Sequence, residues 1–334
     1  MRKRSRLLWI PMAAGAVALL AAAWIPLPYF AVGPGPAREV VPLIAVDGHP
    51  TYDSGKLVMT TVSFRKVTGL TAMLAWLDPN EAVVGQDLLY PPGLTVAQER
   101  ERSLSQMDTS KIDATSVALE QLTNYPDDHG EGVLIETVYQ ECPAEGELFA
   151  GDLVDSIEGA PIDDVADASD AIDSVAPGDP LTFHVSAAGE QHDVTVTRGS
   201  CPGADRPVVG ISMVNNFPFG VEIASGDIGG PSAGMMYALG LYDLLTPGDL
   251  TDGRLVAGTG TMGLDGSVGP IGGIADKIVA AHGIGAQVFL VPKDNLAEAR
   301  SVDAGAMQLI SVDSFDDALR ALGVSLPAGT PAAA

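Results

Sequence analysis

Ser232 lies in a glycine-rich segment that suits a serine for attack on a carbonyl carbon. The run GGPSAGM (229–235) joins a β-branched segment to a predicted helix that has Pro231 as its first residue and Ser232 in its first turn. Unpaired backbone N–H groups and the positive end of the helix dipole at that place can stabilise a developing oxyanion. We therefore predict Ser232 as a nucleophile and Gly229, Gly230 and Pro231 as the oxyanion loop. A serine that only caps the helix is the alternative.

Lys277 is the candidate general base for this serine. It follows the glycine-rich segment 266–276 and stands in the opening part of a second predicted helix. A lysine accepts a proton only as the neutral amine, so burial among apolar neighbours must lower its pKa. Because a nearby carboxylate would stabilise the ammonium form, Asp276 must point away from the amine.

The run around Ser232 also fits G-x-S-x-G, which is typical of esterases that use a serine, an acid and a histidine. Only His282 follows Ser232, inside a predicted helix. An esterase that uses His282 is therefore a minor alternative.

The composition excludes several classes of function. The chain has 334 residues, with 43 acidic and 18 basic residues and a formal net charge of −25. Phosphate binding requires clustered lysine and arginine, so we expect no nucleic-acid partner. Two cysteines and the absence of an HExxH motif leave no basis for a metal site, and we expect no cofactor.

The N-terminal segment predicts attachment to a membrane. Residues 7–32 carry no charge and follow the basic sequence MRKRSR. About 20 apolar residues span a bilayer, and the basic cluster should stay in the cytoplasm. We therefore predict that residues 1–32 form a cytoplasmic basic start and one transmembrane anchor, with a linker at 33–38 and an extracytoplasmic catalytic part at the cell membrane. A cleaved signal peptide is the alternative.

The two motifs together resemble the Ser–Lys dyad region of the Lon protease proteolytic domain. GGPSAGM and GxVxPIGGIxDK carry the resemblance, the sequence AGTG (257–260) matches a further element, and the similarity runs from about Phe219 to Leu322. It implies Ser232 as nucleophile, Lys277 as general base and Thr259 as the residue that positions the lysine. Lon enzymes carry an ATPase, whereas this sequence has no G-x-x-x-x-G-K-[ST] motif. The resemblance is therefore to ATP-independent, membrane-bound relatives.

Residues 129–200 resemble a PDZ domain. Strands are predicted near 132–135, 151–159, 181–185 and 193–197, with a helix at 165–175. PDZ domains bind the C-termini of peptides by adding a strand to a sheet edge. The resemblance implies that Gly132, Val133 and Leu134 hold the peptide carboxylate, and that the pocket is shaped by Val165, Ala168 and Ile172. Cys142 and Cys201 could form a disulfide or remain two thiols.

The predicted fold class is α+β, with the PDZ-like module inserted into the Lon-type domain. Too little chain separates the module from Ser232 to supply the strands upstream of the nucleophile. Residues 39–128 should supply them, ahead of the main proteolytic part at 204–325; a separate N-terminal domain is the alternative. We expect strands at Val40–Val46, Lys56–Phe64 and Leu70–Leu77, two helices within Thr95–Leu122, and a disordered tail at 326–334.

The functional hypothesis is an ATP-independent Ser–Lys endopeptidase that cleaves unfolded or flexible extracytoplasmic proteins. Its partners would be protein or peptide substrates, selected partly by the PDZ-like domain through their C-termini, and the membrane through residues 7–32. A homo-oligomer is left open. The competing hypothesis is a non-catalytic membrane-anchored PDZ scaffold.

Overall fold

The computed structural model describes residues 23–52, 55–90, 95–187 and 189–326. The predicted basic start, most of the predicted anchor and the tail from residue 327 lie outside the described residues. Within those ranges, no helix combines the length and the apolar character needed to cross a bilayer.

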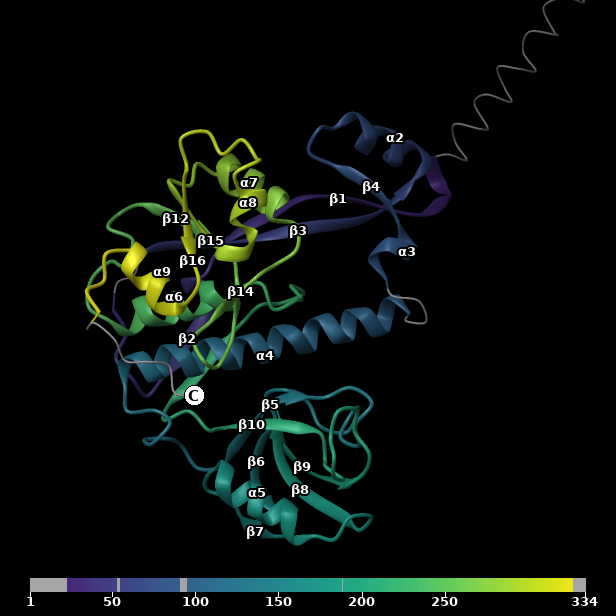
Figure 1. Cartoon of the computed structure of the whole chain (residues 1–334), viewed down its shortest axis with the longest axis vertical. Coiled ribbons are helices and arrows are strands. Elements are labelled where there is room, and N and C mark those ends of the chain that lie inside the picture. The colour runs from purple at the N-terminus through teal and green to yellow at the C-terminus, as the bar shows by residue number, and fades with distance from the viewer. Residues whose placement is uncertain (1–22, 53–54, 91–94, 188, 327–334) are drawn as a thin grey trace, which may run out of the picture.

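A six-stranded sheet organises the first of two bodies, and its strands come from both ends of the chain. The order is β16-β15-β12-β3-β1-β4. Strand β3 pairs in parallel with β12 and antiparallel with β1, so the N-terminal strands lie in the same sheet as the strands around the Ser232 and Lys277 motifs (Figure 1). The strands are β1 (Pro26–Glu39), β3 (Lys56–Thr68), β4 (Ala82–Gly85), β12 (Leu255–Gly258), β15 (Val288–Pro292) and β16 (Gln308–Val312).

Helices cover both faces of this sheet. Alternate residues of β3 face opposite ways: Leu57 and Met59 belong to the larger core with α4, α6 and α9, whereas Val58 belongs to a second core with α7. The helices and short elements of this body are η1 (Val41–Leu43), α2 (Gly69–Leu77), α3 (Gln86–Leu89), α4 (Val96–Leu122), α6 (Gly234–Leu245), α7 (Ile274–Gly283), η2 (Lys293–Asn295), α8 (Leu296–Ala299) and α9 (Phe315–Ala321). Two small sheets pair β2 (Ile44–Asp47) with β11 (Gly220–Ile223) and β13 (Thr261–Met262) with β14 (Val268–Gly269).

Strand β1 corrects the predicted end of the anchor and the predicted linker. Residues 26–32 and 33–38 are both strand, not membrane helix and connector. The glycines allow the close approach of neighbouring backbone, because a Cβ at Gly33 would lie 2.9 Å from Asn80 O and one at Gly35 would collide with Thr61. The apolar character of 26–32 therefore reflects a place in the sheet.

Two further predictions assigned the wrong type of secondary structure. Residues 70–77 form helix α2, whose N-terminus has a capping box between Thr68 and Thr71, instead of a strand. Of the strand predicted at Val40–Val46, only the part from Ile44 is strand, and it follows the 3₁₀ turn η1.

Helix α4 is one unbroken helix where two were predicted. Two polar residues near the middle of this span, Thr109 and Ser110, are docked against other parts of the chain. Thr109 Oγ1 donates to Glu136 O at 2.8 Å, and Ser110 Oγ donates to Pro231 O at 2.9 Å. The mid-helix hydroxyls therefore join α4 to its neighbours without interrupting it.

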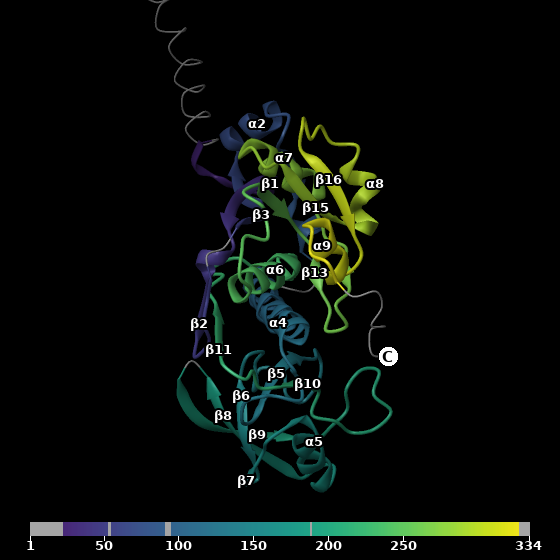
Figure 2. The ribbon, with the colours of Figure 1, turned by 90° about the vertical axis from the view of Figure 1, so that its left-hand side faces the viewer.

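The second body is a PDZ-like module with its own sheet and core. Its sheet has the order β10-β5-β6-β8-β9, with β7 paired to β6, and helix α5 packs beside it (Figure 2). The elements are β5 (Val133–Val138), β6 (Leu153–Ile157), β7 (Ala160–Pro161), α5 (Val165–Ser174), β8 (Pro180–Ala187), β9 (Glu190–Thr197) and β10 (Ile211–Asn215).

The module extends beyond the predicted boundary at residue 200. Strand β10 pairs antiparallel with β5, so residues 211–215 belong to the module and not to the proteolytic part that was predicted from 204. The preceding loop is held by a disulfide between Cys142 and Cys201. The two ends of the module are adjacent, because the Gly130 N–H donates to Asn216 O at 3.0 Å. The chain thus leaves the first body and returns to it at one place.

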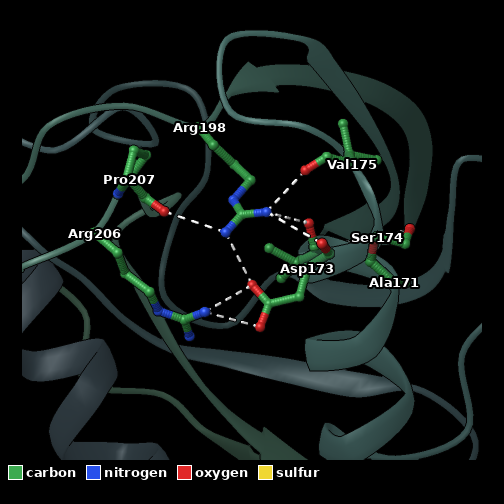
Figure 3. Close-up of polar contacts among 8 residues, drawn as sticks. Ala171, Asp173, Ser174, Val175, Arg198, Arg206 and Pro207 are labelled. Atoms are coloured by element: carbon green, nitrogen blue, oxygen red, sulfur yellow. Dashed lines mark hydrogen bonds and ion pairs between the residues drawn. The ribbon is translucent and has the colours of Figure 1, made fainter.

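A buried arginine connects helix α5 to the loop that leads to β10 (Figure 3). Arg198 is only 7% exposed, and its guanidinium donates to the carbonyls of Ile172, Val175 and Pro207 and to the carboxylate of Asp173. The carbonyls at the end of a helix have no partner within it, and a cation satisfies them. Arg206 reaches the same carboxylate from an exposed position.

The insertion predicts which fragments fold. Residues 217–326 alone lack β1, β3 and α4, so they should be insoluble or unfolded. The chain from 23 to 326 with residues 131–215 replaced by a short Gly–Ser linker should fold, because the ends that the linker joins already lie together. Circular dichroism and thermal unfolding of the two fragments test this. A cooperative unfolding transition for 217–326 would contradict the insertion.

The two arginines in Figure 3 should differ strongly in their effect on stability. Arg198→Met leaves buried carbonyls without a donor and should lower the free energy of unfolding by about 2–4 kcal/mol. Arg206→Met breaks an exposed ion pair to the same carboxylate and should cost less than about 1 kcal/mol. Urea unfolding of both variants measures the difference. Equal losses would show that the buried carbonyls do not need Arg198.

Candidate active site

Ser232 lies in the turn between β11 and α6, just before the helix begins. Helix α6 starts at Gly234 with Ala233 as its N-cap, so Pro231 is not its first residue and Ser232 is not in its first turn, contrary to the prediction. The Ser232 carbonyl accepts hydrogen bonds from the Gly260 N–H and from Thr259 Oγ1, both at 2.9 Å. These bonds fix the serine backbone against the end of strand β12.

Lys277 reaches Ser232 from the first turn of α7. The residue before this helix, Gly273, has a left-handed φ of 69°, a conformation that favours glycine. The lysine side chain is 3% exposed, and its Nζ lies 2.7 Å from Ser232 Oγ and 2.8 Å from Thr259 Oγ1. The structure therefore brings the three residues Ser232, Thr259 and Lys277 into one hydrogen-bonded chain.

The environment of the lysine favours its neutral form. Burial lowers the pKa of Lys277 from 10.5 to about 8. Among the described residues, no carboxylate forms an ion pair with it. The neighbouring Asp276 lines the same cavity without pairing with the amine, and burial, followed by the charge of Glu298, raises the pKa of its carboxyl. A neutral amine within hydrogen-bond distance of a serine hydroxyl can act as its base.

A cavity of about 750 Å³ opens beside the Ser232–Lys277 pair. Strand β3, helix α4 and the loop before Ser232 line it, with the apolar residues Val62, Met107, Ile228 and Ile271 among the contributors. This volume is within the range of small-molecule and peptide side-chain sites. The cavity therefore offers space for a substrate chain next to the serine hydroxyl.

The predicted oxyanion loop shapes this cavity but lacks free donors at two of its positions. The Gly230 N–H donates to Ser103 O at 2.7 Å, and Pro231 has no N–H. Gly229 packs so closely on Ser103 that a Cβ there would collide with its hydroxyl. The backbone N–H groups of Ser232 and Ala233 have no partner among the described residues, and both residues line the cavity.

Helix α4 holds the loop before the nucleophile, a role that sequence reasoning missed. Its Ser103 carbonyl binds Gly230, and its Ser110 hydroxyl binds the Pro231 carbonyl. The sequence carried a partial signal at Ser110, because a hydroxyl in the middle of a long helix commonly bonds to a partner outside it or back to its own helix, whereas the Ser103 contact is made by a backbone carbonyl that no residue type reveals. Without the fold, nothing indicated which loop they would contact.

His282 does not contribute to this site. Its ring lies against Gly305, and in the part of the chain that the structure describes no hydrogen bond joins it to Ser232. The esterase alternative required that bond, so the observed partner of the serine favours the lysine.

The residues predicted to bind a peptide occupy two different environments. Val133 and Leu134 pair with β10 on one side and with β6 on the other, and Gly132 O accepts from the Asn216 N–H. A strand with both edges paired cannot accept a peptide, so the predicted carboxylate loop at Gly132–Leu134 is misplaced. On α5, Ala168 is part of the module core, whereas Val165 and Ile172 are half-buried beside β10.

Comparison with known proteins agrees with this geometry. Residues 193–324 match the Lon protease (S16) C-terminal proteolytic domain. Lon protease of Clostridium beijerinckii is 37% identical over 113 residues, which is 32% of this chain and 14% of that protein. Lon protease 2 of Bacillus subtilis is 36% identical over 115 residues, 34% of this chain and 19% of that protein. The chain thus spans less than a fifth of the length of these curated relatives.

Solved structures similar to this chain include PDZ domains. One from the SdrC-like protein of Listeria monocytogenes has 25% identity and a TM-score of 0.24, covering 25% of this chain and 90% of that one. Its counterpart from Listeria innocua has 25% identity and a TM-score of 0.23, covering 25% and 93%. From the family match at 193–324 and the dyad within it, the chain contains a Lon-type proteolytic domain, the catalytic domain of a serine peptidase.

Proposed function

We propose that this protein is an ATP-independent serine endopeptidase that cleaves flexible segments of extracytoplasmic proteins. The observation that carries the proposal is the 2.7 Å hydrogen bond between Lys277 Nζ and Ser232 Oγ, in a buried site where no carboxylate of the described residues pairs with the lysine.

Acylation follows from the geometry of this pair. The neutral Lys277 amine takes the Ser232 hydroxyl proton as Oγ attacks the scissile carbonyl carbon. The negative charge that forms on the carbonyl oxygen is stabilised by the Ser232 and Ala233 N–H groups. The Lys277 ammonium then donates its proton to the leaving amine, which departs and leaves an ester on Ser232. Thr259 accepts a hydrogen bond from Nζ throughout and keeps the amine aimed at the serine.

Deacylation reverses the roles. Lys277, neutral again, takes a proton from a water molecule that attacks the ester carbonyl. The same N–H groups stabilise the second oxyanion, and Lys277 returns the proton to Ser232 Oγ as the ester bond breaks. The new carboxyl end leaves, and the enzyme is back in its starting form.

The extracytoplasmic location has independent support. The disulfide between Cys142 and Cys201 is of a kind that persists in oxidising compartments. Residues 7–22 are uncharged and follow a basic start, as in a membrane anchor with its N-terminus in the cytoplasm. ATP independence has a separate support: the pair Gly55-Lys56 is followed by Leu57 where an ATP-binding loop has Ser or Thr, and the Gly55 N–H donates to the buried carboxylate of Asp243.

Substrate selection by the PDZ-like module is proposed at strand β10. It is the outer strand of the module sheet, next to β5, and among the described residues no strand pairs with its other edge. Its half-buried Ile211 and Met213 pack with Val165 and Ile172 of α5 against the module core. A peptide could add as a strand to β10, with its side chains against α5.

The dyad predicts the effects of two substitutions and of pH. Ser232→Ala should lower kcat/KM for peptide hydrolysis by at least about 10³-fold. Lys277→Arg should be equally inactive, since arginine stays protonated. For the unaltered protein, kcat/KM should rise about tenfold per pH unit below the lysine pKa and level off above about 8, because only the neutral amine is competent.

A serine-directed phosphonate probe separates the alternatives. It should label the unaltered protein and His282→Ala but neither dyad variant. A non-catalytic scaffold would remain unlabelled, and an esterase would lose labelling with His282→Ala. Substantial turnover by Lys277→Arg would overturn the assignment of the base.

Peptide capture at β10 predicts a difference between the two outer strands of the module. Met213→Glu should raise the Kd of a C-terminal peptide at least about tenfold, whereas Thr195→Glu on β9, the other outer strand, should leave the Kd unchanged. Fluorescence anisotropy measures both, and hydrolysis of a short peptide controls for folding. Amidation of the peptide's end carboxylate should weaken its binding. Equal affinity for the free and amidated forms would contradict a PDZ-type site.

A further inference from the structure

Helix α2 exposes its large apolar residues and buries its small ones. Leu70, Met73, Leu74 and Leu77 follow the i, i+3, i+4, i+7 spacing of one helix face, and they are 37%, 54%, 56% and 66% exposed. The opposite side packs through Ala72 and Ala75 onto Ala31, Val67 and Val83. A surface helix in water normally has the reverse arrangement. The exposed face therefore lacks a partner within the described residues.

Other exposed apolar side chains lie on the same helix and directly before β1. Trp76 borders the face on α2 and is 78% exposed. Trp24 and Ile25, which come directly before β1, are 81% and 58% exposed. An apolar surface built from two tryptophans and several aliphatic residues is more than the scattered exposure usual for a soluble domain.

The N-terminal chain meets this surface. Pro26, the first residue of β1, is paired in register with Thr68, the N-cap of α2. In Figure 1, α2 lies at the end of the β1–β3 hairpin where the purple start of β1 is found. The uncharged residues 7–22 come just before Ala23, so a segment suited to hydrocarbon ends beside the apolar face.

We propose that the surface formed by Trp24, Ile25, Trp76 and the outer face of α2, which we call the apolar apex, lies in the interfacial layer of the bilayer beside the anchor. The inference rests on the proposed anchoring of residues 7–22 and adds a second membrane contact to it. Tryptophans prefer this layer, and a short helix with one apolar face lies flat in it. Lys66 is exposed on β3 two residues before Thr68, where its long side chain can reach lipid phosphates, whereas Arg65 pairs with Glu81.

A second contact would fix the height of the active site above the membrane. Strand β3 lines the catalytic cavity through Val62 and Phe64 and continues to Thr68, where α2 begins. At the rise of an extended strand, Val62 and Thr68 are about 20 Å apart. The substrates within reach would then be chain segments close to the outer membrane surface, such as the juxtamembrane parts of other membrane proteins.

Tryptophan fluorescence in vesicles tests the proposal with the full chain. The sequence has three tryptophans, so Trp9→Phe and Trp24→Phe leave Trp76 as the only one. The protein is reconstituted into phosphatidylcholine–phosphatidylglycerol vesicles whose acyl chains carry bromine either near the headgroup or near the bilayer centre. Bromine near the headgroup should quench most of the Trp76 fluorescence. Bromine near the bilayer centre should quench much less of it. The matched control replaces Trp76 with Phe and introduces Phe149→Trp in the module, where Phe149 is 59% exposed; its emission should be unaffected.

The outcomes separate the inference from the anchoring on which it rests. If the protein does not float with the vesicles, both the anchoring of residues 7–22 and the bilayer contact of the apolar apex are wrong. If it floats but Trp76 is not quenched by either lipid, only the contact of the apolar apex is overturned. If Trp76 is unquenched by lipid yet shielded from iodide in the water, a second copy of the chain covers the apex and the bilayer contact is again wrong. Met73→Ser with Leu74→Ser should reduce the bromine quenching while leaving hydrolysis of a short peptide unchanged.

Discussion

The site depends on one amine that is buried without a countercharge. A pKa lowered from 10.5 to about 8 means that charging Lys277 costs about 3 kcal/mol more than in water. The polar atoms that touch Nζ are the neutral hydroxyls of Ser232 and Thr259. In a chain with a formal net charge of −25, this is a demanding condition, because a carboxylate beside the amine would restore the ammonium and remove the base. The packing of α7 and β12 around Lys277 therefore stabilises the fold and also favours the neutral form of the amine.

Helix α4 joins this site to the module. Through Ser103 and Ser110 it holds the loop that precedes the nucleophile, and through Thr109 it contacts Glu136 of β5. One turn further on, burial and then the charge of Glu136 raise the pKa of Asp113 to about 8, so that Asp113 is protonated at neutral pH. The contact between the two bodies thus contains a neutral carboxylic acid beside a second carboxyl group, in place of the salt bridges that are common at domain surfaces.

The sequence predicted the catalytic residues more accurately than it predicted the fold around them. Ser232 and Lys277 could be chosen because a serine and a lone lysine in glycine-rich turns at helix starts suit a nucleophile and its base, and the resemblance to the Lon proteolytic domain added Thr259. Local patterns failed where tertiary contacts decide the outcome. The uncharged residues 26–32 resemble a membrane segment but fill the sheet, and Leu70–Leu77 resembles a buried strand but is a helix with its apolar side exposed. Strand β10 was missed as part of the module because its pairing with β5 bridges more than 70 residues of sequence.

The insertion also sets the order in which the molecule can be completed as the chain emerges from its N-terminus to its C-terminus. Strands β1 and β3 and helix α4 are synthesised first, but the apolar residues of β3 remain uncovered until β12 and α6 appear. The module between them builds its own sheet and core within residues 130–216, so it can close before the rest of the chain has emerged. Once closed, it holds residues 130 and 216 together and shortens the effective loop between β3 and β12, which lowers the entropic cost of pairing them. The PDZ-like module in this way also brings together the two halves of the chain that form the six-stranded sheet.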